Sequence, residues 1–251
     1  PRLAVAAIIA LSCVTASARF GQGNGTRSAS SSMTHNDPMP TDLFESTRHK
    51  IALAPGAYLL GGFARHAGEA LLDELSLVSI DAPFRHLETP GGYRMSVAMT
   101  NCGSVGWVSD RQGYRYSPTD PLSERRWPEM PACFSDLARR AALAAGFADY
   151  RPDACLINRY EPGSRLTLHQ DRDEAKIDAP IISISLGISA TFLWGGPKRT
   201  DPVQRHPLHH GDVVVWGGPS RLNFHGIAPI VTDMHPLTGA FRYNLTFRHA
   251  M

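Results

Sequence analysis

The feature that most constrains this chain is an alternating segment near its carboxyl end, 241–248. Every second residue in the segment is apolar or aromatic, and the residues between them are Arg242, Asn244, Thr246 and Arg248. Because successive side chains of a β-strand point to opposite faces, the alternation predicts a strand with one face against an apolar layer. The other face then presents two guanidinium groups, which are costly to bury unless each of them meets an anion.

A second polar pair, His169 and Asp171, has the same spacing of two residues, and a separate His225 follows. Leu166 and Leu168 alternate with the polar residues, which places His169 and Asp171 on one face of a predicted strand. Taken alone, such a pair is usually a solvated strand face. With His225 added, two imidazoles and one carboxylate match the ligand set that binds non-haem Fe(II) and leaves coordination positions open, whereas zinc favours four closed ligands or a different mixture. Two inward arginines nearby favour a cosubstrate that bears carboxylates.

These motifs occur together with others, and the combination is specific where a lone His-x-Asp would not be. The segments that carry a resemblance are Asn158-Arg159-Tyr160, His169-x-Asp171, His225, 242–248, 95–103 and 210–218. Through them the chain resembles the AlkB family of Fe(II)/2-oxoglutarate dioxygenases, from about Leu43 to Arg248.

The resemblance implies Fe(II), 2-oxoglutarate and O2 as cofactor and cosubstrates. It implies His169, Asp171 and His225 as the metal ligands. The residues that it implies for binding 2-oxoglutarate are Asn158, Tyr160, Arg242, Asn244 and Arg248. Among these, Arg242 would bind the distal carboxylate and Arg248 would lie near the metal-proximal end.

For the substrate, the resemblance implies Trp107, Tyr114, Asp173 and Arg199. Trp107 would stack a methylated base against His169, and the Asp173 carboxylate would favour a cationic methylated base, as expected from simple electrostatics. A tryptophan is more often part of a core, and Asp173 with Glu174 is more often part of a solvated turn. His209 and His210 are interpreted as solvent-facing residues of a turn.

The pattern predicts an α+β, mainly β protein with a double-stranded β-helix, or jelly roll. Two helices are expected in the amino-terminal half and are predicted to cover one sheet. One has an apolar face of Leu71, Leu72, Leu75 and Val78, and the other spans residues 131–145. Residues 95–127 are expected to hold strand-like pieces and a polar, aromatic loop. We predict a single domain over 41–251, with a nucleotide-recognition lid within 41–130 and the jelly-roll core at 154–249.

Composition adds little about function. The formal net charge of +2 neither requires nor excludes nucleic acid. The four cysteines form no CxxC or zinc-like cluster and are interpreted as reduced thiols. Residues 1–40 are predicted to be a disordered tail. Its beginning either is a secretory signal or lies upstream of a start at Met33. We expect a cytoplasmic monomer that does not bind membranes.

The predicted function is oxidative demethylation of N-alkylated nucleobases in DNA, such as 1-methyladenine and 3-methylcytosine, releasing formaldehyde, succinate and CO2. Single strands are expected to be preferred over duplexes, and RNA is a further possible substrate. Two alternatives stay open. One is an oxygenase of the same fold that acts on protein or small molecules, which Trp107, Tyr114 and Asp173 disfavour. The other is a non-catalytic nucleic-acid binder, which the complete triad and both arginines disfavour.

Overall fold

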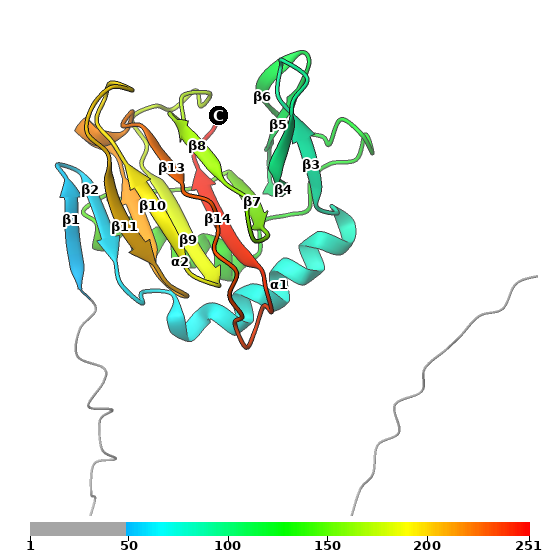
Figure 1. Ribbon diagram of the computed structural model, residues 1–251. Helices are drawn as coiled ribbons and strands as arrows, with labels where there is room; N and C mark the ends of the chain where they lie inside the picture. Colours follow the sequence, from blue (N-terminus) through cyan, green and yellow to red (C-terminus); the bar gives the residue numbers. More distant parts are fainter. Residues whose placement is uncertain (1–48) are drawn as a thin grey trace, which may run out of the picture. The chain divides into compact units, whose positions relative to one another are not determined.

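The alternating segment forms strand β14 (Arg242–Arg248), shown in red in Figure 1, and it lies inside the large sheet rather than at its edge. Its neighbours are β9 (Ile181–Gly187) and β7 (Ala154–Tyr160), and it pairs antiparallel with both along nearly its whole length. Strand β14 is therefore held by two ladders of backbone hydrogen bonds. This fixes the direction of each side chain along it.

The computed structural model describes residues 49–251 of the chain. The large sheet has eight strands in the order β1 (Lys50–Ala54), β2 (Ala57–Leu60), β12 (Val213–Trp216), β9, β14, β7, β4 (Arg94–Gly103) and β3 (Arg85–Glu88). A second sheet has four strands in the order β11 (Gln204–Leu208), β10 (Ala190–Trp194), β13 (His225–Ile227) and β8 (Leu166–His169). The pairings within both sheets are antiparallel, which agrees with the predicted jelly roll. Strands β1 to β4 precede residue 154 and extend the large sheet beyond the predicted core range.

Two apolar layers lie on the two faces of the large sheet. On β14, Leu245 and Phe247 face the layer that contains the helices, and on β12 the side chains of Val213 and Val215 do the same. The alternate residues Val214 and Trp216 of β12 enter the layer between the two sheets. A fully buried side chain of this size contributes about 1.5–3 kcal/mol to the stability of the fold. The alternation predicted for β14 is thus confirmed.

Both predicted helices are present, and both cover the same face of the large sheet (Figure 1). Helix α1 (Gly68–Asp81) buries Leu71, Leu75 and Val78, while Leu72 is partly buried. Helix α2 (Ala132–Ala144) follows Pro131 and packs Phe134 edge-on against Phe247 of β14. The helix layer thereby supports the back of the strand whose front carries the arginines. Two short 3-10 helices, η1 (Arg65–Ala67) and η2 (Gly218–Ser220), complete the helical elements among the described residues.

The predicted polar, aromatic loop is instead a two-stranded hairpin. Strands β5 (Gly106–Asp110) and β6 (Gly113–Ser117) pair across a tight turn at Arg111 and Gln112, and in Figure 1 they rise beside β3 and β4. Gly113 has a φ of 120°, which only glycine adopts readily. The loop prediction was wrong because the alternation in this short segment is obscured by polar residues on both faces.

The described residues belong to one compact unit. The calls on the signal-like segment and on the tail at 1–40 fall outside the described residues. Of the four cysteines, Cys102, Cys133 and Cys155 are described, and all three are free thiols, as expected.

Within the described part of the chain, no helix is both long enough and apolar enough to cross a bilayer.

Candidate metal and cosubstrate site

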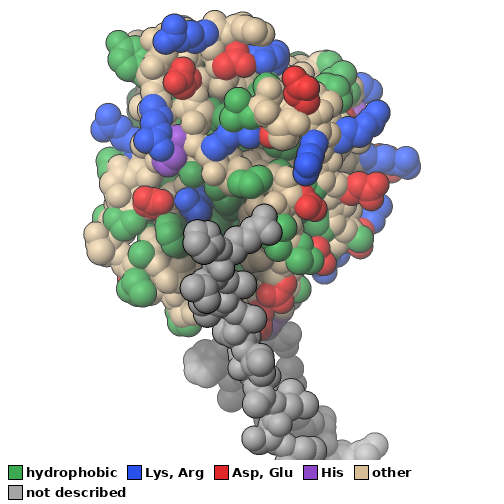
Figure 2. Space-filling view, turned by 90° about the vertical axis from the view of Figure 1, so that its right-hand side faces the viewer, with side chains coloured by type: hydrophobic (Ala, Val, Ile, Leu, Met, Phe, Trp, Pro, Cys, Tyr) green, Lys and Arg blue, Asp and Glu red, His purple; other side chains and the backbone are tan. Residues whose placement is uncertain are grey.

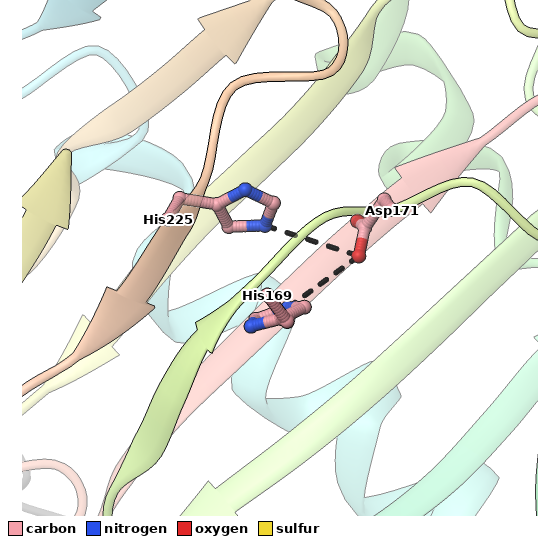
Figure 3. Close-up of side chains that lie close together, drawn as sticks. All are labelled: His169, Asp171 and His225. Carbon is pink, nitrogen blue, oxygen red and sulfur yellow. Dashed lines mark ion pairs between the residues drawn. The ribbon is translucent and has the colours of Figure 1, made fainter. Parts of the chain in front are cut away.

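His169, Asp171 and His225 converge between the two sheets (Figure 3). His169 ends β8, His225 begins β13, and the two residues are direct partners in the pairing of these strands. Asp171 follows β8 after a single residue. Its Oδ1 lies 3.4 Å from Nε2 of His169 and 3.8 Å from Nε2 of His225. Among the residues that the structure describes, this is the one group of three or more such side chains close enough to share a metal ion.

Hydrogen bonds to the backbone determine which nitrogen of each imidazole is free. Nδ1 of His169 lies 2.8 Å from the carbonyl oxygen of Thr167, and Nδ1 of His225 lies 3.0 Å from that of Asn223. A carbonyl oxygen only accepts, so each Nδ1 carries a proton and each Nε2 faces Asp171. Burial, together with the nearby His169, lowers the pKa of His225 to about 4. His225 is therefore neutral near pH 7, which is the form that binds metal.

Asp171 uses its two carboxylate oxygens differently. Oδ1 faces both imidazoles, while Oδ2 accepts hydrogen bonds from Nη2 of Arg248 at 2.6 Å and from its Nε at 3.1 Å. Burial alone would raise the pKa of Asp171, but the Arg248 guanidinium and the imidazoles hold it well below its ordinary value. The charged form of the carboxylate is thus maintained in a buried position, and one oxygen remains directed at the imidazoles.

Arg242 presents unused donors to the same cavity. Its side chain is 1% exposed, stacks on the Tyr160 ring and donates from Nη2 to the Ser185 hydroxyl at 3.0 Å. Its Nε and Nη1 are buried and have no hydrogen-bond partner among the described residues. Burial lowers the pKa of this guanidinium. A buried cation with two free donors fits a carboxylate, which would satisfy both.

Hydrogen bonds between polar side chains also connect β14 to the strands on either side. Asn244 donates to the Ser183 hydroxyl at 2.7 Å, and its amide oxygen accepts from Thr246 at 2.8 Å and from Asn158 at 3.3 Å. Arg242 lies opposite Tyr160, and Asn244 lies opposite Asn158, in the pairing of β14 with β7. The five residues predicted for the cosubstrate therefore lie on the cavity face of two neighbouring strands, and all five line one cavity of about 980 Å³.

The residues predicted for the substrate line the same cavity at its outer part. Trp107 stacks on Tyr114 with ring centroids 5.5 Å apart, and its Nε1 donates to Asp173 at 2.9 Å. Arg199 is exposed, donates to the Leu168 carbonyl at 2.8 Å and lies over the Phe224 ring. The structure brings all four together with the triad, although in it Trp107 faces Tyr114 rather than a free surface.

One sequence interpretation was wrong, and another was confirmed only in part. Glu174 is not in a solvated turn. Its side chain is 2% exposed, and its carboxylate pairs with Arg221 at 2.9 Å and Arg248 at 3.1 Å. His209 is exposed and His210 lies in a turn, as interpreted, but His210 is only partly exposed, because its ring stacks on His235 and its Nδ1 accepts from the Gly187 amide. Arg221 was not identified at all, since nothing in its local sequence distinguishes it from a surface arginine.

An aromatic group surrounds His225. Trp216 lies 4.8 Å from the His225 ring and Phe192 lies 6.3 Å from it, measured between ring centroids. Both line the cavity, whereas Trp194 packs behind them against the same two rings. The apolar wall limits the access of water to this side of the triad.

A jelly roll that holds two histidines and one carboxylate between its sheets, with a buried arginine directed at the same cavity, defines the class of 2-oxoglutarate- and iron-dependent oxygenases. The sequence profile of the 2OG-Fe(II) oxygenase superfamily matches residues 56–248. The alpha-ketoglutarate-dependent dioxygenase AlkB of Salmonella typhimurium is 58% identical over 210 residues, which cover 83% of this chain and 97% of that protein.

Two more distant relatives indicate the same family. A solved structure of OsALKBH1 has a TM-score of 0.70 and 30% identity, and the match covers 80% of this chain and 99% of that one. The human nucleic acid dioxygenase ALKBH1 is 33% identical over 128 residues, covering 51% of this chain and 32% of that protein. The chain belongs to the AlkB family of 2-oxoglutarate- and Fe(II)-dependent dioxygenases.

Proposed function

We propose that this dioxygenase removes N-methyl groups from nucleobases of DNA, with 1-methyladenine and 3-methylcytosine as substrates and RNA as a possible second substrate. The observation that carries the proposal is that one cavity combines two sets of residues. Deep in it lie the triad and the free donors of Arg242, and near its mouth lie two stacked aromatic rings and a carboxylate. The first set fits the cosubstrate, and the second set fits a flat, cationic base.

His169, Asp171 and His225 would hold the iron, and Arg242 would bind the far carboxylate of 2-oxoglutarate through Nε and Nη1. Asn158, Tyr160 and Asn244 would line the same binding site, with Arg248 beside Asp171. When bound, iron and 2-oxoglutarate supply the oxidising chemistry: one O2 converts 2-oxoglutarate to succinate and CO2 and hydroxylates the substrate methyl group. The resulting hydroxymethyl group leaves the base nitrogen as formaldehyde.

At the substrate end, Trp107 and Tyr114 offer aromatic faces on which an extruded base can stack. To receive a base between Trp107 and His169, the Trp107 ring must separate from Tyr114 or the base must enter on its opposite face. Asp173 already accepts from Nε1 of Trp107 at 2.9 Å, so one carboxylate can orient the indole and also attract a positively charged methylated base.

Backbone phosphates would meet arginines around the mouth. Arg94, Arg165, Arg172 and Arg199 line the cavity. Figure 2, which shows the face on the side of β3 and the β5–β6 hairpin, has Lys and Arg side chains in separate groups among acidic and hydrophobic ones. This scattered distribution favours contact with a short single strand over an extended duplex contact. We further propose that the protein acts as a monomer in the cytoplasm.

A panel of methylated and unmethylated oligomers tests the proposal, with formaldehyde and succinate measured in each reaction. Single-stranded DNA, duplex DNA and RNA should each be included, and methylated single-stranded DNA is expected to give the fastest formaldehyde release. Extrusion of a base costs less from a single strand, because pairing need not be broken. Succinate formation without formaldehyde from any oligomer would instead support an oxygenase that acts on protein or small molecules. Binding without succinate would support a non-catalytic binder.

A further inference from the structure

Arg221 is a buried arginine whose donors are directed at one short segment of the chain. Its side chain is 4% exposed. Nη1 donates to the backbone carbonyl of Asp171 at 2.6 Å, Nη2 donates to the Glu174 carboxylate at 2.9 Å, and Nε donates to the carbonyl of Ala179 at 2.9 Å. The three acceptors lie at the beginning, near the middle and at the end of residues 171–179, the segment that starts with a triad residue. A single guanidinium therefore holds this loop at three points.

Arg221 connects the chain segment of Asp171 with the segment that leads to His225. It follows η2 directly and precedes His225 by four residues. The Asn223 carbonyl between them fixes Nδ1 of His225, and the Asn223 side chain donates to Gly195 at 3.1 Å. The segment that orients His225 is thus anchored by hydrogen bonds, and Arg221 ties the Asp171 loop to it.

Glu174 extends the connection to two further elements. Its Oε1 accepts from the Tyr116 hydroxyl of β6 at 2.7 Å and pairs with Nε of Arg248 at 3.1 Å. Two buried carboxylates, Asp171 and Glu174, are therefore balanced by two buried guanidiniums, Arg221 and Arg248. Without Arg221 the Asp171 carbonyl would lose a buried donor, and Glu174 would keep only one of its two cations.

We propose that Arg221 is a positioning residue for the metal site; the inference rests on the proposed ligation by His169, Asp171 and His225. By fixing the backbone of Asp171, Arg221 limits the directions that the carboxylate can take. Arg248 occupies Oδ2, and Oδ1 is thereby left facing the two imidazoles. Groups that hydrogen-bond to metal ligands without touching the metal typically contribute about 10- to 100-fold to metal affinity.

The direct test is the variant Arg221→Gln in the full chain, probed with Co(II), which reports its coordination through its visible absorption. Calorimetry should show Co(II) binding weakened by about 10- to 100-fold, and the absorption bands should differ from those of the wild type. Arg221→Lys keeps the charge opposite Glu174 but cannot reach both backbone carbonyls. It should fold, and its Co(II) affinity should lie between those of the wild type and Arg221→Gln. If Arg221→Gln does not fold, Arg221→Lys decides the question by the same two measurements.

A matched control separates positioning from stability. Arg85 pairs with the buried Asp120, away from the triad, so Arg85→Gln also removes a cation from a buried carboxylate. It should lower the melting temperature but leave Co(II) affinity and absorption unchanged. Wild-type Co(II) affinity and spectrum in a folded Arg221→Gln or Arg221→Lys would overturn the inference. Asp171→Ala distinguishes that result from failure of the site itself: it should lose Co(II) binding, and if it does not, the proposed ligand set is wrong.

Discussion

The two ends of the cavity are built in different ways. The cosubstrate end lies on β14 and β7, inside the eight-stranded sheet, where Arg242 is 1% exposed and has two donors that find no partner within residues 49–251. At the substrate end, Trp107 and Tyr114 lie on a two-stranded hairpin, where Tyr114 is 48% exposed. There Trp107 already has a stacking partner in Tyr114 and a hydrogen-bond acceptor in Asp173.

The difference shows where each end of the site obtains its specificity. At the cosubstrate end, the buried polar groups are already oriented by the fold. A carboxylate that binds there would therefore find its hydrogen-bond donors in place. At the substrate end, the aromatic and acidic groups satisfy one another, so a base must compete with contacts that already exist. We therefore expect substitutions to have larger effects at the deep end than at the mouth.

Asp171→Ala should give the largest effect, because it removes the group that faces both imidazoles. Formaldehyde release should be abolished in the oligomer assay. Arg248 keeps Glu174 as a partner, so the loss in unfolding free energy should remain below the about 3–5 kcal/mol typical of an orphaned buried charge. Asp136→Ala, which removes an exposed carboxylate from α2, serves as the control. Wild-type formaldehyde release from Asp171→Ala would contradict the proposed triad.

Arg242→Lys tests the preorganised end directly. A lysine carries the charge but not the planar pair of donors, and a charge-assisted hydrogen bond contributes about 1.5–3 kcal/mol. The 2-oxoglutarate concentration needed for half-maximal rate should rise roughly tenfold to a hundredfold, while oligomer binding stays as in the wild type. If the 2-oxoglutarate requirement does not change, the carboxylate binds elsewhere in the cavity.

Trp107→Ala tests the hairpin end. Loss of one base–aromatic stack should weaken binding of methylated oligomers by about 1–3 kcal/mol, less the energy of the Trp107–Tyr114 contact that a base must displace. Succinate formation in the absence of any oligomer should persist, because the hydrogen bonds and the ring stacking of Trp107 involve Asn101, Asp173 and Tyr114 and no triad or cosubstrate residue. Trp107→Phe keeps an aromatic ring but loses the hydrogen bond to Asp173. Its affinity for methylated oligomers should lie between those of the wild type and Trp107→Ala. An unchanged affinity in Trp107→Ala would mean that Trp107 only packs the hairpin.

Asp173→Asn should have the smallest effect, since the carboxylate is exposed and screened by solvent. An exposed charge pair is worth about 0.2–1 kcal/mol, so the preference for a cationic lesion over a neutral methylated base should fall by roughly fivefold or less. The ratio of formaldehyde release from 1-methyladenine and from 1-methylguanine measures this preference. A loss of activity comparable to that of Arg242→Lys would show that the two ends are not as different as the structure indicates.

The sequence by itself determined the elements whose pattern is local. The period of two in 241–248 predicted which side chains of β14 face an apolar layer and which form a polar face, because successive side chains of a strand point to opposite sides. The apolar spacing also predicted the buried face of α1, and Pro131 predicted where α2 begins. The resemblance of the triad and arginine motifs identified the family before any distance was known.

Only the tertiary structure decided the roles of Glu174 and Arg221. They are 47 residues apart in the chain, and Tyr116, which donates to the same carboxylate, is 58 residues away from it. Each is a charged or polar residue in a segment that reads as a solvated loop or turn. Whether such a residue is buried depends on a partner that another part of the chain supplies. Long-range pairing of this kind leaves no period in the sequence, so the network behind the metal site becomes visible only when the two sheets and the hairpin are assembled.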